Sequence, residues 1–185
     1  MPEIRRICAQ ELKQCASQLR IGDKILLSGY VYTARDAAHK RIAALLDAGG
    51  ELPFALDGAV IYYAGPTPAP PGKPIGSCGP TTSGRMDPYA PRLLDLGLAA
   101  MIGKGERSEA VREAVARNQA VYLCAVGGVG ALAARCIKEM QVIAFEDLGC
   151  ESVKRLYLED FPLVVCNDAQ GGDLFSEGRS AYAAE

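Results

Sequence analysis

The sequence contains no tryptophan, a single histidine, and no large excess of charge of either sign. Aromatic residues make up 6% of the 185 residues, so the core must be built mainly from Leu, Ile, Val and Ala. A net charge of −2 argues against a nucleic-acid binder held by bulk charge, since such domains usually carry a strong basic excess. Hydrophobic residues at 49% exclude a disordered tail, a collagen-like chain and a coiled coil, and favour a globular protein.

Closely spaced cysteine pairs are also missing. The seven cysteines are an odd number at irregular gaps, and none forms a Cys-x-x-Cys pair. Because metal and iron–sulfur sites usually use at least one such pair, the spacing argues against a zinc or iron–sulfur site held by this chain alone. It favours reduced thiols in the cytoplasm, several of them buried as small hydrophobic residues.

Long uninterrupted apolar runs are absent as well. The longest run, 121–134, is broken by Gly127, Gly128 and Gly130, and it is too short to span a bilayer. The first residues lack the apolar stretch of a signal peptide. We therefore expect a cytoplasmic protein that neither enters a membrane nor binds nucleic acid.

The apolar pattern alternates between strand-like and helix-like segments along the chain. The segments typical of strands are 25–32, 60–63, 99–102, 121–126, 142–145 and 163–166, while 153–158 is ambiguous. The segments typical of helices are 38–46, 93–96, 108–118 and 131–140. This alternation predicts an α/β fold with a mainly parallel sheet. Neither a repeat nor a linker is visible, so we expect residues 1–185 to form one domain, with the proline-rich stretch 66–74 as a loop.

Charged residues stand where the first predicted helix begins. Arg35, Asp36 and His39 follow the strand 25–32, and ligand groups in open α/β sheets often lie at such a point. Arg35 is able to clamp a carboxylate with two parallel hydrogen bonds, and Asp36 and His39 share one face of the helix. The same residues also suit an ordinary helix start with a surface histidine. His39 is the only histidine, so any imidazole chemistry must use it.

Two further loops are rich in groups that bind anions. Residues 79–87 combine glycines and a proline with the hydroxyls of Thr81, Thr82 and Ser83, followed by Arg85. Such a loop suits a small dianion, although an ordinary turn with a surface arginine has the same composition. Lys104 lies between two glycines after the strand 99–102, a site for an anion or a plain strand-end turn. It is not a P-loop, because glycine stands where a serine or threonine should follow the lysine.

The segment 128–133 fits the dinucleotide-binding pattern G-x-G-x-x-A, between a predicted strand and a predicted helix. Only about 40 residues follow the acidic residue Glu146, which is too few for a full dinucleotide domain. Close packing of a helix on the sheet is the alternative explanation of the small residues.

Five segments together resemble one family, the β subunit of the two-subunit iron–sulfur hydro-lyases, namely class I fumarate hydratase and L-tartrate dehydratase. They are GYVYTARDAAH (29–39), YYAGP (62–66), GPTTSGRMD (79–87), IGKG (102–105) and FEDLG (145–149). Their order is the family's order, and the resemblance runs from about residue 5 to residue 175. It implies a swivelling β/β/α domain of three layers with a largely parallel sheet, and it gives the glycines at 127–130 a place other than a dinucleotide site.

The resemblance also implies that the functional residues are divided between two subunits. The cysteines that bind the 4Fe-4S cluster lie in the partner α subunit, so none of the seven cysteines here is assigned as a ligand. Arg35, Arg85 and Lys104 are the expected cations for the substrate carboxylates, together with the hydroxyls of the 81–83 loop, Thr81, Thr82 and Ser83. Thr81 matches the family's candidate for proton transfer, while Asp36 and His39 are expected mainly to orient Arg35 and the loop.

Two activities and one other class of function remain open at this stage. The leading hypothesis is the β subunit of a fumarate hydratase, which adds water reversibly to fumarate to give L-malate. The first alternative is an L-tartrate dehydratase, because the choice of dicarboxylate also depends on residues of the partner. The other is a stand-alone module that binds a small acid or a nucleotide. We expect a hetero-oligomer with the α subunit, and possible homodimers of the chain alone.

Overall fold

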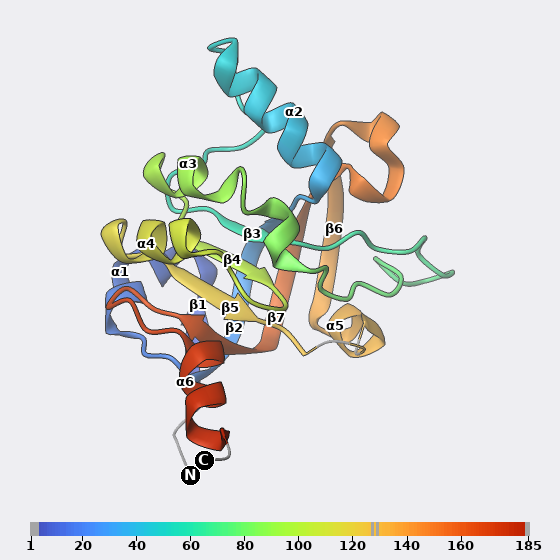
Figure 1. The fold of residues 1–185 in the computed structure, drawn as a ribbon. Coiled ribbons are helices and arrows are strands. Elements are labelled where there is room, and N and C mark those ends of the chain that lie inside the picture. The colour runs from blue at the N-terminus through green and yellow to red at the C-terminus, as the bar shows by residue number, and fades with distance from the viewer. Residues whose placement is uncertain (1–3, 127, 129, 184–185) are drawn as a thin grey trace.

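The alternating apolar pattern of residues 24–33 produces a ten-residue strand that buries Ile25, Leu27 and Val31 on one face. Such strands dominate the computed structural model, which describes residues 4–126, 128 and 130–183 (Figure 1). The strands are β1 (Arg5–Cys8), β2 (Lys24–Thr33), β3 (Val60–Tyr62), β4 (Ala100–Gly103), β5 (Val121–Cys124), β6 (Ile137–Ala144) and β7 (Val153–Asn167). The helices are α1 (Leu12–Cys15), α2 (Asp36–Asp47), α3 (Ala90–Asp95), α4 (Glu109–Arg117), α5 (Gly130–Cys136) and α6 (Leu174–Tyr182). Short 3₁₀ turns are η1 (Ala9–Glu11), η2 (Ala16–Gln18), η3 (Ser83–Met86) and η4 (Glu146–Glu151).

In the part of the chain that the structure describes, seven strands form one sheet in the order β1-β2-β3-β4-β5-β7-β6. The strands β1 to β5 pair in parallel with their neighbours, whereas β7 runs antiparallel to β2, β5 and β6. Because β7 pairs with β2 as well as with β5, the sheet closes on itself through β2, β3, β4, β5 and β7. The expected α/β fold with a largely parallel sheet is confirmed.

Apolar side chains pack on both faces of the parallel strands, which explains why β3 and β4 are buried throughout. On one face, Tyr62 and Ile102 join a cluster with side chains of β1, β2 and β7. On the other face, Ile61 and Met101 join a second cluster with side chains of α2, α3 and α4. The layers are therefore helices, parallel strands and the β7 side of the sheet, in agreement with the expected β/β/α arrangement.

The sequence pattern and the structure differ in the last third of the chain. The segment 131–140 is predicted to be one helix, but α5 ends at Cys136 and β6 begins at Ile137, so this prediction is wrong for residues 137–140. The segments 153–158 and 163–166 belong to a single strand, β7, with Asp160 between them at a positive φ of 47°. Part of the glycine-rich pattern at 127–130 lies outside the described residues.

The strands that flank α5 also bear on the dinucleotide hypothesis. A dinucleotide site needs a helix that connects two parallel neighbouring strands. Here α5 leads from β5 to β6, and β6 pairs antiparallel with β7 rather than parallel with β5. This topology argues against a dinucleotide-binding unit.

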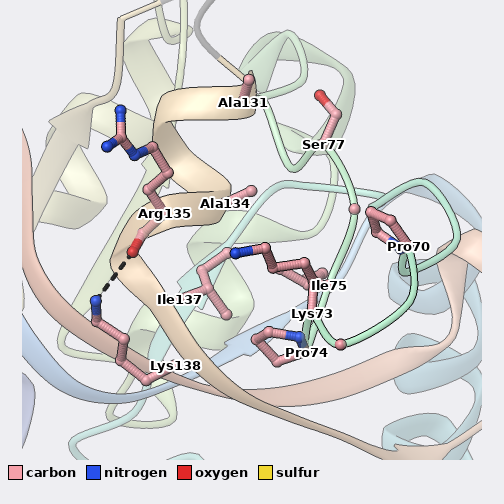
Figure 2. Close-up of a pocket in the computed structure, with 12 residues that line it drawn as sticks. Pro70, Lys73, Pro74, Ile75, Ser77, Ala131, Ala134, Arg135, Ile137 and Lys138 are labelled. Carbon is pink, nitrogen blue, oxygen red and sulfur yellow. Dashed lines mark hydrogen bonds between the residues drawn. The ribbon is translucent and has the colours of Figure 1, made fainter.

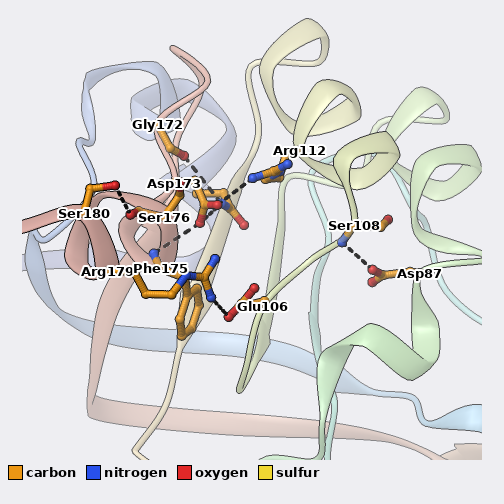
Figure 3. A network of polar contacts seen from close by, with 11 residues as sticks. Asp87, Glu106, Ser108, Arg112, Gly172, Asp173, Phe175, Ser176, Arg179 and Ser180 are labelled. Carbon is orange, nitrogen blue, oxygen red and sulfur yellow. Dashed lines mark hydrogen bonds and ion pairs between the residues drawn. The ribbon is translucent and has the colours of Figure 1, made fainter. Parts of the chain in front are cut away.

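Helix α6 docks on α4 through ion pairs, as Figure 3 shows. The Asp173 carboxylate caps α6 by accepting a hydrogen bond from the Phe175 backbone, and it also accepts one from Arg112 of α4 at 2.6 Å. Arg179 pairs with Glu106 on the loop that leads into α4. Among residues 4–126, 128 and 130–183, no helix is long and apolar enough to cross a membrane.

Candidate active site at the carboxyl ends of β2, β3 and β4

The predicted site residues follow the carboxyl ends of three neighbouring parallel strands. Thr33 at the end of β2 pairs with Tyr62 of β3, and Tyr62 pairs with Ile102 of β4. The loop 81–85 is tied to these ends, because the Thr81 N–H donates to the carbonyl oxygen of Tyr63 at 2.7 Å. Since the carboxyl ends of parallel strands meet at one edge, three segments far apart in sequence become neighbours.

The acidic and basic side chains at this edge alternate in a short row. Glu151 lies 3.5 Å from a terminal nitrogen of Arg35, and the Arg35 Nε lies 3.9 Å from Asp36. Asp36 in turn accepts two hydrogen bonds from Arg85, at 2.9 Å from Nε and 2.6 Å from Nη2. The planar guanidinium of Arg85 therefore already shows the two-bond geometry that suits a carboxylate.

Arg35 differs from Arg85 because it retains unused hydrogen-bonding capacity. Its Nε is buried and has no hydrogen-bond partner among the described residues. Buried donors are nearly always paired, so an unpaired one at the edge of a site points to a group that is added on binding. A carboxylate is the natural partner for such a donor.

The three hydroxyl residues of the loop have different surroundings. Ser83 is buried, and its Oγ accepts a hydrogen bond from the Lys104 backbone N–H at 3.0 Å and donates one to the Tyr122 hydroxyl at 2.8 Å, because Tyr122 uses its own proton on the Gly105 carbonyl oxygen at 2.8 Å. Thr82 is exposed and bridges to Lys104 through the backbone, while Thr81 is half-buried. Ser83 thus holds the loop against the end of β4, and Thr81 and Thr82 are the hydroxyls that remain available.

Lys104 contributes its backbone to this loop contact, since its carbonyl oxygen accepts a hydrogen bond from the Ser83 N–H at 2.9 Å. Its ammonium group forms no ion pair with any carboxylate among the described residues. Lys104 is therefore the cation of the site whose charge is not offset by a neighbouring carboxylate.

His39 lies behind the site rather than on its surface. The ring is fully buried beside Tyr63 and Tyr89, and its Nδ1 lies 2.9 Å from the carbonyl oxygen of Arg35. A carbonyl oxygen only accepts, so Nδ1 carries the proton and donates it. Burial lowers the pKa of His39 to about 4, which keeps the imidazole neutral near pH 7. The alternative of a surface histidine at a helix start is wrong.

Arg107 is a buried arginine packed under the loops of the site, and no sequence pattern predicted it. The Arg107 guanidinium is 0% exposed, donates to Asp87 at 2.7 Å, and lies over the rings of Tyr63 and Tyr122. The Tyr122 hydroxyl accepts a hydrogen bond from the Ser83 hydroxyl, which connects this buried ion pair to the loop 81–85. Asp87 and Arg107 lie 20 positions apart, and no local pattern relates them.

Neither cysteines nor carboxylates gather into a ligand set in this structure. In the portion of the chain that is described, no group of three or more His, Cys, Asp or Glu residues could hold a metal ion. All seven cysteines are free thiols. The described residues of this chain therefore do not fit an iron–sulfur cluster by themselves.

A cavity of about 540 Å³ lies away from this site, between the proline-rich loop and α5 (Figure 2). Pro74, Ile75 and Ile137 line it. Figure 2 shows the guanidinium of Arg135 turned away from Pro74, and the Lys138 ammonium donates to the Arg135 carbonyl oxygen at 3.1 Å. The cavity is therefore mainly apolar, and it does not contain the charged row that ends at Arg85.

The geometry defines an α/β domain in which Arg35, Arg85, Lys104 and a hydroxyl loop lie at the carboxyl ends of neighbouring parallel strands. Comparison with known proteins identifies the family. The sequence matches the family described as "Fumarase C-terminus" over residues 3–178, and the chain belongs to this family.

Individual relatives fall into two size classes. The chain is 39% identical over 170 residues to "Fumarate hydratase class I, anaerobic" of Escherichia coli and 38% identical over 169 residues to "Fumarate hydratase 2" of Leishmania major. These alignments cover 91% and 90% of this chain but 31% and 30% of the relatives, so the chain spans about a third of their length. It is also 35% identical over 175 residues to "Putative L(+)-tartrate dehydratase subunit beta" of Methanocaldococcus jannaschii, covering 89% of this chain and 88% of that protein.

Proposed function

We propose that this chain is the β subunit of an iron–sulfur-dependent hydro-lyase, and that the enzyme is a fumarate hydratase that interconverts fumarate and L-malate. The observation that carries this proposal is the buried, unpartnered Nε of Arg35, which shares Asp36 with Arg85 beside the loop that contacts Lys104. A dicarboxylate presents two anionic groups, and a set of three cations with a hydroxyl loop suits that charge.

The site residues take distinct roles in this proposal. Arg35, Arg85 and Lys104 bind the substrate carboxylates, and Thr81 and Thr82 donate hydroxyl hydrogen bonds to them. Addition of water to fumarate places negative charge on a carboxylate in the intermediate, and the same cations stabilise that charge. Thr81 is the candidate for proton transfer at carbon, a role that needs an activating neighbour because a threonine hydroxyl is a poor base.

The remaining predicted residues act through their neighbours. Asp36 holds Arg85 through two hydrogen bonds, and Ser83 holds the loop on β4. His39 donates a hydrogen bond from inside α2 to the carbonyl oxygen of Arg35. We therefore assign Asp36 and His39 an orienting role. Ser83 acts on the substrate indirectly, by anchoring the loop that carries Thr81 and Thr82.

A partner subunit completes the proposed enzyme. Asp36 and Glu151 already offset two of the three cations, so this chain provides less positive charge than a dianion needs. We propose that an α subunit supplies the missing groups and ligates the 4Fe-4S cluster. The name of the Methanocaldococcus relative, a "subunit beta" of similar length, supports a two-subunit arrangement.

We further propose that residues 1–185 act as one domain within a hetero-oligomer, and that the chain alone forms a homodimer. Free thiols at all seven cysteines support a reducing compartment such as the cytoplasm.

The second candidate is an L-tartrate dehydratase β subunit. The alignment to the Methanocaldococcus protein covers most of both chains, whereas the fumarate hydratases extend far beyond this chain. Both substrates are four-carbon dicarboxylates, so the same cations suit either one.

The test is reconstitution of this chain with its cluster-bearing α subunit and assay with fumarate, L-tartrate and mesaconate. Hydration of fumarate supports the leading proposal, and selective dehydration of L-tartrate supports the second. The chain alone should be colourless and inactive, so a brown chain with hydratase activity by itself would contradict the two-subunit proposal. Failure of the reconstituted, cluster-loaded pair on all three substrates would refute both activities.

A further inference from the structure

Glu151, the last residue of the turn η4, uses both of its carboxylate oxygens at the candidate site. One oxygen lies 3.5 Å from a terminal nitrogen of Arg35. The other accepts a hydrogen bond of 2.9 Å from the backbone N–H of Ala37, in the first turn of α2. Glu151 therefore bridges the side chain of Arg35 and the start of the helix that follows it, where a carboxylate is also favoured by the helix dipole.

The backbone sets this distance through a buried contact between β2 and β7. The Thr33 hydroxyl donates to the Ser152 carbonyl oxygen at 3.3 Å and accepts from the Lys154 backbone N–H at 3.1 Å. Arg35 lies two residues after Thr33, and Glu151 lies one residue before Ser152. The two charged side chains are thus placed from a fixed point in the sheet.

The turn that carries Glu151 is itself held by a lysine. The Lys154 ammonium donates to the carbonyl oxygens of Gly149, Cys150 and Ser152 at 3.1–3.2 Å and to the Ser152 hydroxyl at 2.7 Å. Gly149 adopts φ 58° and ψ −116°, a backbone conformation that residues other than glycine rarely adopt. The turn therefore has little freedom to move Glu151 away from Arg35.

Gly65 packs closely against both Arg35 and η4. A Cβ atom at position 65 would lie 2.8 Å from Nη1 and 3.0 Å from Cδ of Arg35, and 3.3 Å from the Cys150 carbonyl oxygen. The Arg35 side chain therefore contacts both Gly65 and η4, and its Nε has no hydrogen-bond partner among the described residues. Packing and charge together restrict the movement of this side chain.

We propose that Glu151 is a positioning residue that holds the Arg35 guanidinium in the orientation that binds a substrate carboxylate. This proposal rests on the proposed function, because it assigns Arg35 to the substrate. Without Glu151, the guanidinium loses one of its two flanking carboxylates and swings towards Asp36, which already pairs with Arg85.

The test uses the reconstituted two-subunit enzyme with Glu151→Gln. Glutamine keeps the acceptor for the Ala37 N–H and replaces the charged oxygen that faces Arg35 with an uncharged amide NH₂. We expect the KM for fumarate to rise about tenfold, with a smaller change in kcat, because the lost interaction orients a binding group. Glu151→Asp, which keeps the charge on a shorter side chain, should recover part of the loss.

Asp147→Asn is the matched control for packing of η4 on α2. Asp147 belongs to the same turn and pairs with an arginine of the same helix, Arg41, but on the exposed side. It should leave KM unchanged. An equal rise in KM for both variants would mean that η4 merely needs docking on α2, and it would overturn the positioning role.

A double-mutant cycle with Arg35→Lys completes the test. If Glu151 acts through Arg35, the two substitutions should be strongly non-additive in kcat/KM, whereas additive effects would overturn the proposal. The Arg35 Nε–Hε signal in NMR spectra of the chain alone gives a readout without activity. It should shift in Glu151→Gln but not in Asp147→Asn. If the parent enzyme lacks hydratase activity but this shift occurs, the proposed function fails and Glu151 still positions Arg35; an unchanged signal overturns the positioning itself.

Discussion

Replacing Arg85 with lysine separates substrate binding from structural support at the site. In the structure, Arg85 donates two hydrogen bonds to Asp36, and the two side chains are 48% and 36% exposed. An ion pair this exposed contributes about 1 kcal/mol or less to stability, so Arg85→Lys should leave folding and subunit pairing nearly intact. Lysine keeps the charge but loses the planar pair of donors.

The expected effect on activity is much larger. If the guanidinium holds a substrate carboxylate in the closed site, loss of one charge-assisted hydrogen bond costs about 2–4 kcal/mol, or roughly 30- to 1,000-fold in kcat/KM. The assay is hydration of fumarate by the reconstituted enzyme, with cluster content matched between parent and variant. Thermal unfolding of the same samples measures the structural part.

Arg117→Lys provides the control for this measurement. Arg117 makes the same two-bond contact with Asp95, at 2.8 Å for both bonds, and is 49% exposed. It lies in the last turn of α4, close in sequence to the start of β5 rather than to the carboxyl ends of the strands. Both variants should lose similar stability, and only Arg85→Lys should lose activity. An Arg85→Lys enzyme within threefold of the parent would remove Arg85 from the substrate site.

Two further predictions concern the buried groups behind the site. Arg107→Met leaves Asp87 without its buried partner and should lower the free energy of unfolding, measured in urea titrations, by about 3–5 kcal/mol. The double variant Arg107→Met with Asp87→Asn should lose less stability, because no unpaired carboxylate remains. A loss below about 1 kcal/mol for the single variant would contradict the buried ion pair. Burial of His39 lowers its pKa in the folded protein to about 4, below the value near 6.5 in the unfolded chain. The free energy of unfolding therefore keeps its full value above pH 6.5 and decreases as the pH falls towards 4, because the unfolded chain binds the proton more readily. The parent should lose roughly 3 kcal/mol more than His39→Gln between pH 7 and pH 4, and equal slopes for the two proteins would refute this.

Local sequence signals were sufficient for the parallel strands β2 to β5, but not for β1 (Arg5–Cys8), which was not predicted as a strand. Strands β3 and β4 are short apolar runs between turn residues, and the helical spacing of Val111, Ala114 and Val115 marks α4. They were not sufficient for β6, because the alanine-rich segment 131–140 has helical composition throughout. Pairing of Ile137 and the following residues with β7 overrides that preference, and such pairing depends on residues distant in sequence.

The candidate site shows the same division between local and long-range information. Arg35, Arg85 and Lys104 follow strands or lie in glycine-rich loops, and a local pattern is enough to single them out. Glu151 and Arg107 have no such signal, because their significance comes from partners 116 and 20 positions away, Arg35 and Asp87. The direction of a side chain is equally hidden from the sequence: Ser83 belongs to a row of hydroxyls, yet its oxygen faces Lys104 and Tyr122.

The alternating row from Glu151 to Arg85 has a consequence for ligand binding by the chain alone. Asp36 lies between two guanidiniums that would otherwise repel each other, so it keeps Arg35 and Arg85 close together before any ligand arrives. In the proposed function, a substrate carboxylate competes with Asp36 for Arg85, and only Lys104 offers a charge that no neighbouring carboxylate among the described residues offsets. The carboxylate pairs therefore preorganise the site at the expense of affinity. Tight binding of a dianion requires additional cationic groups or exclusion of water, and a second subunit closing over this edge would provide both.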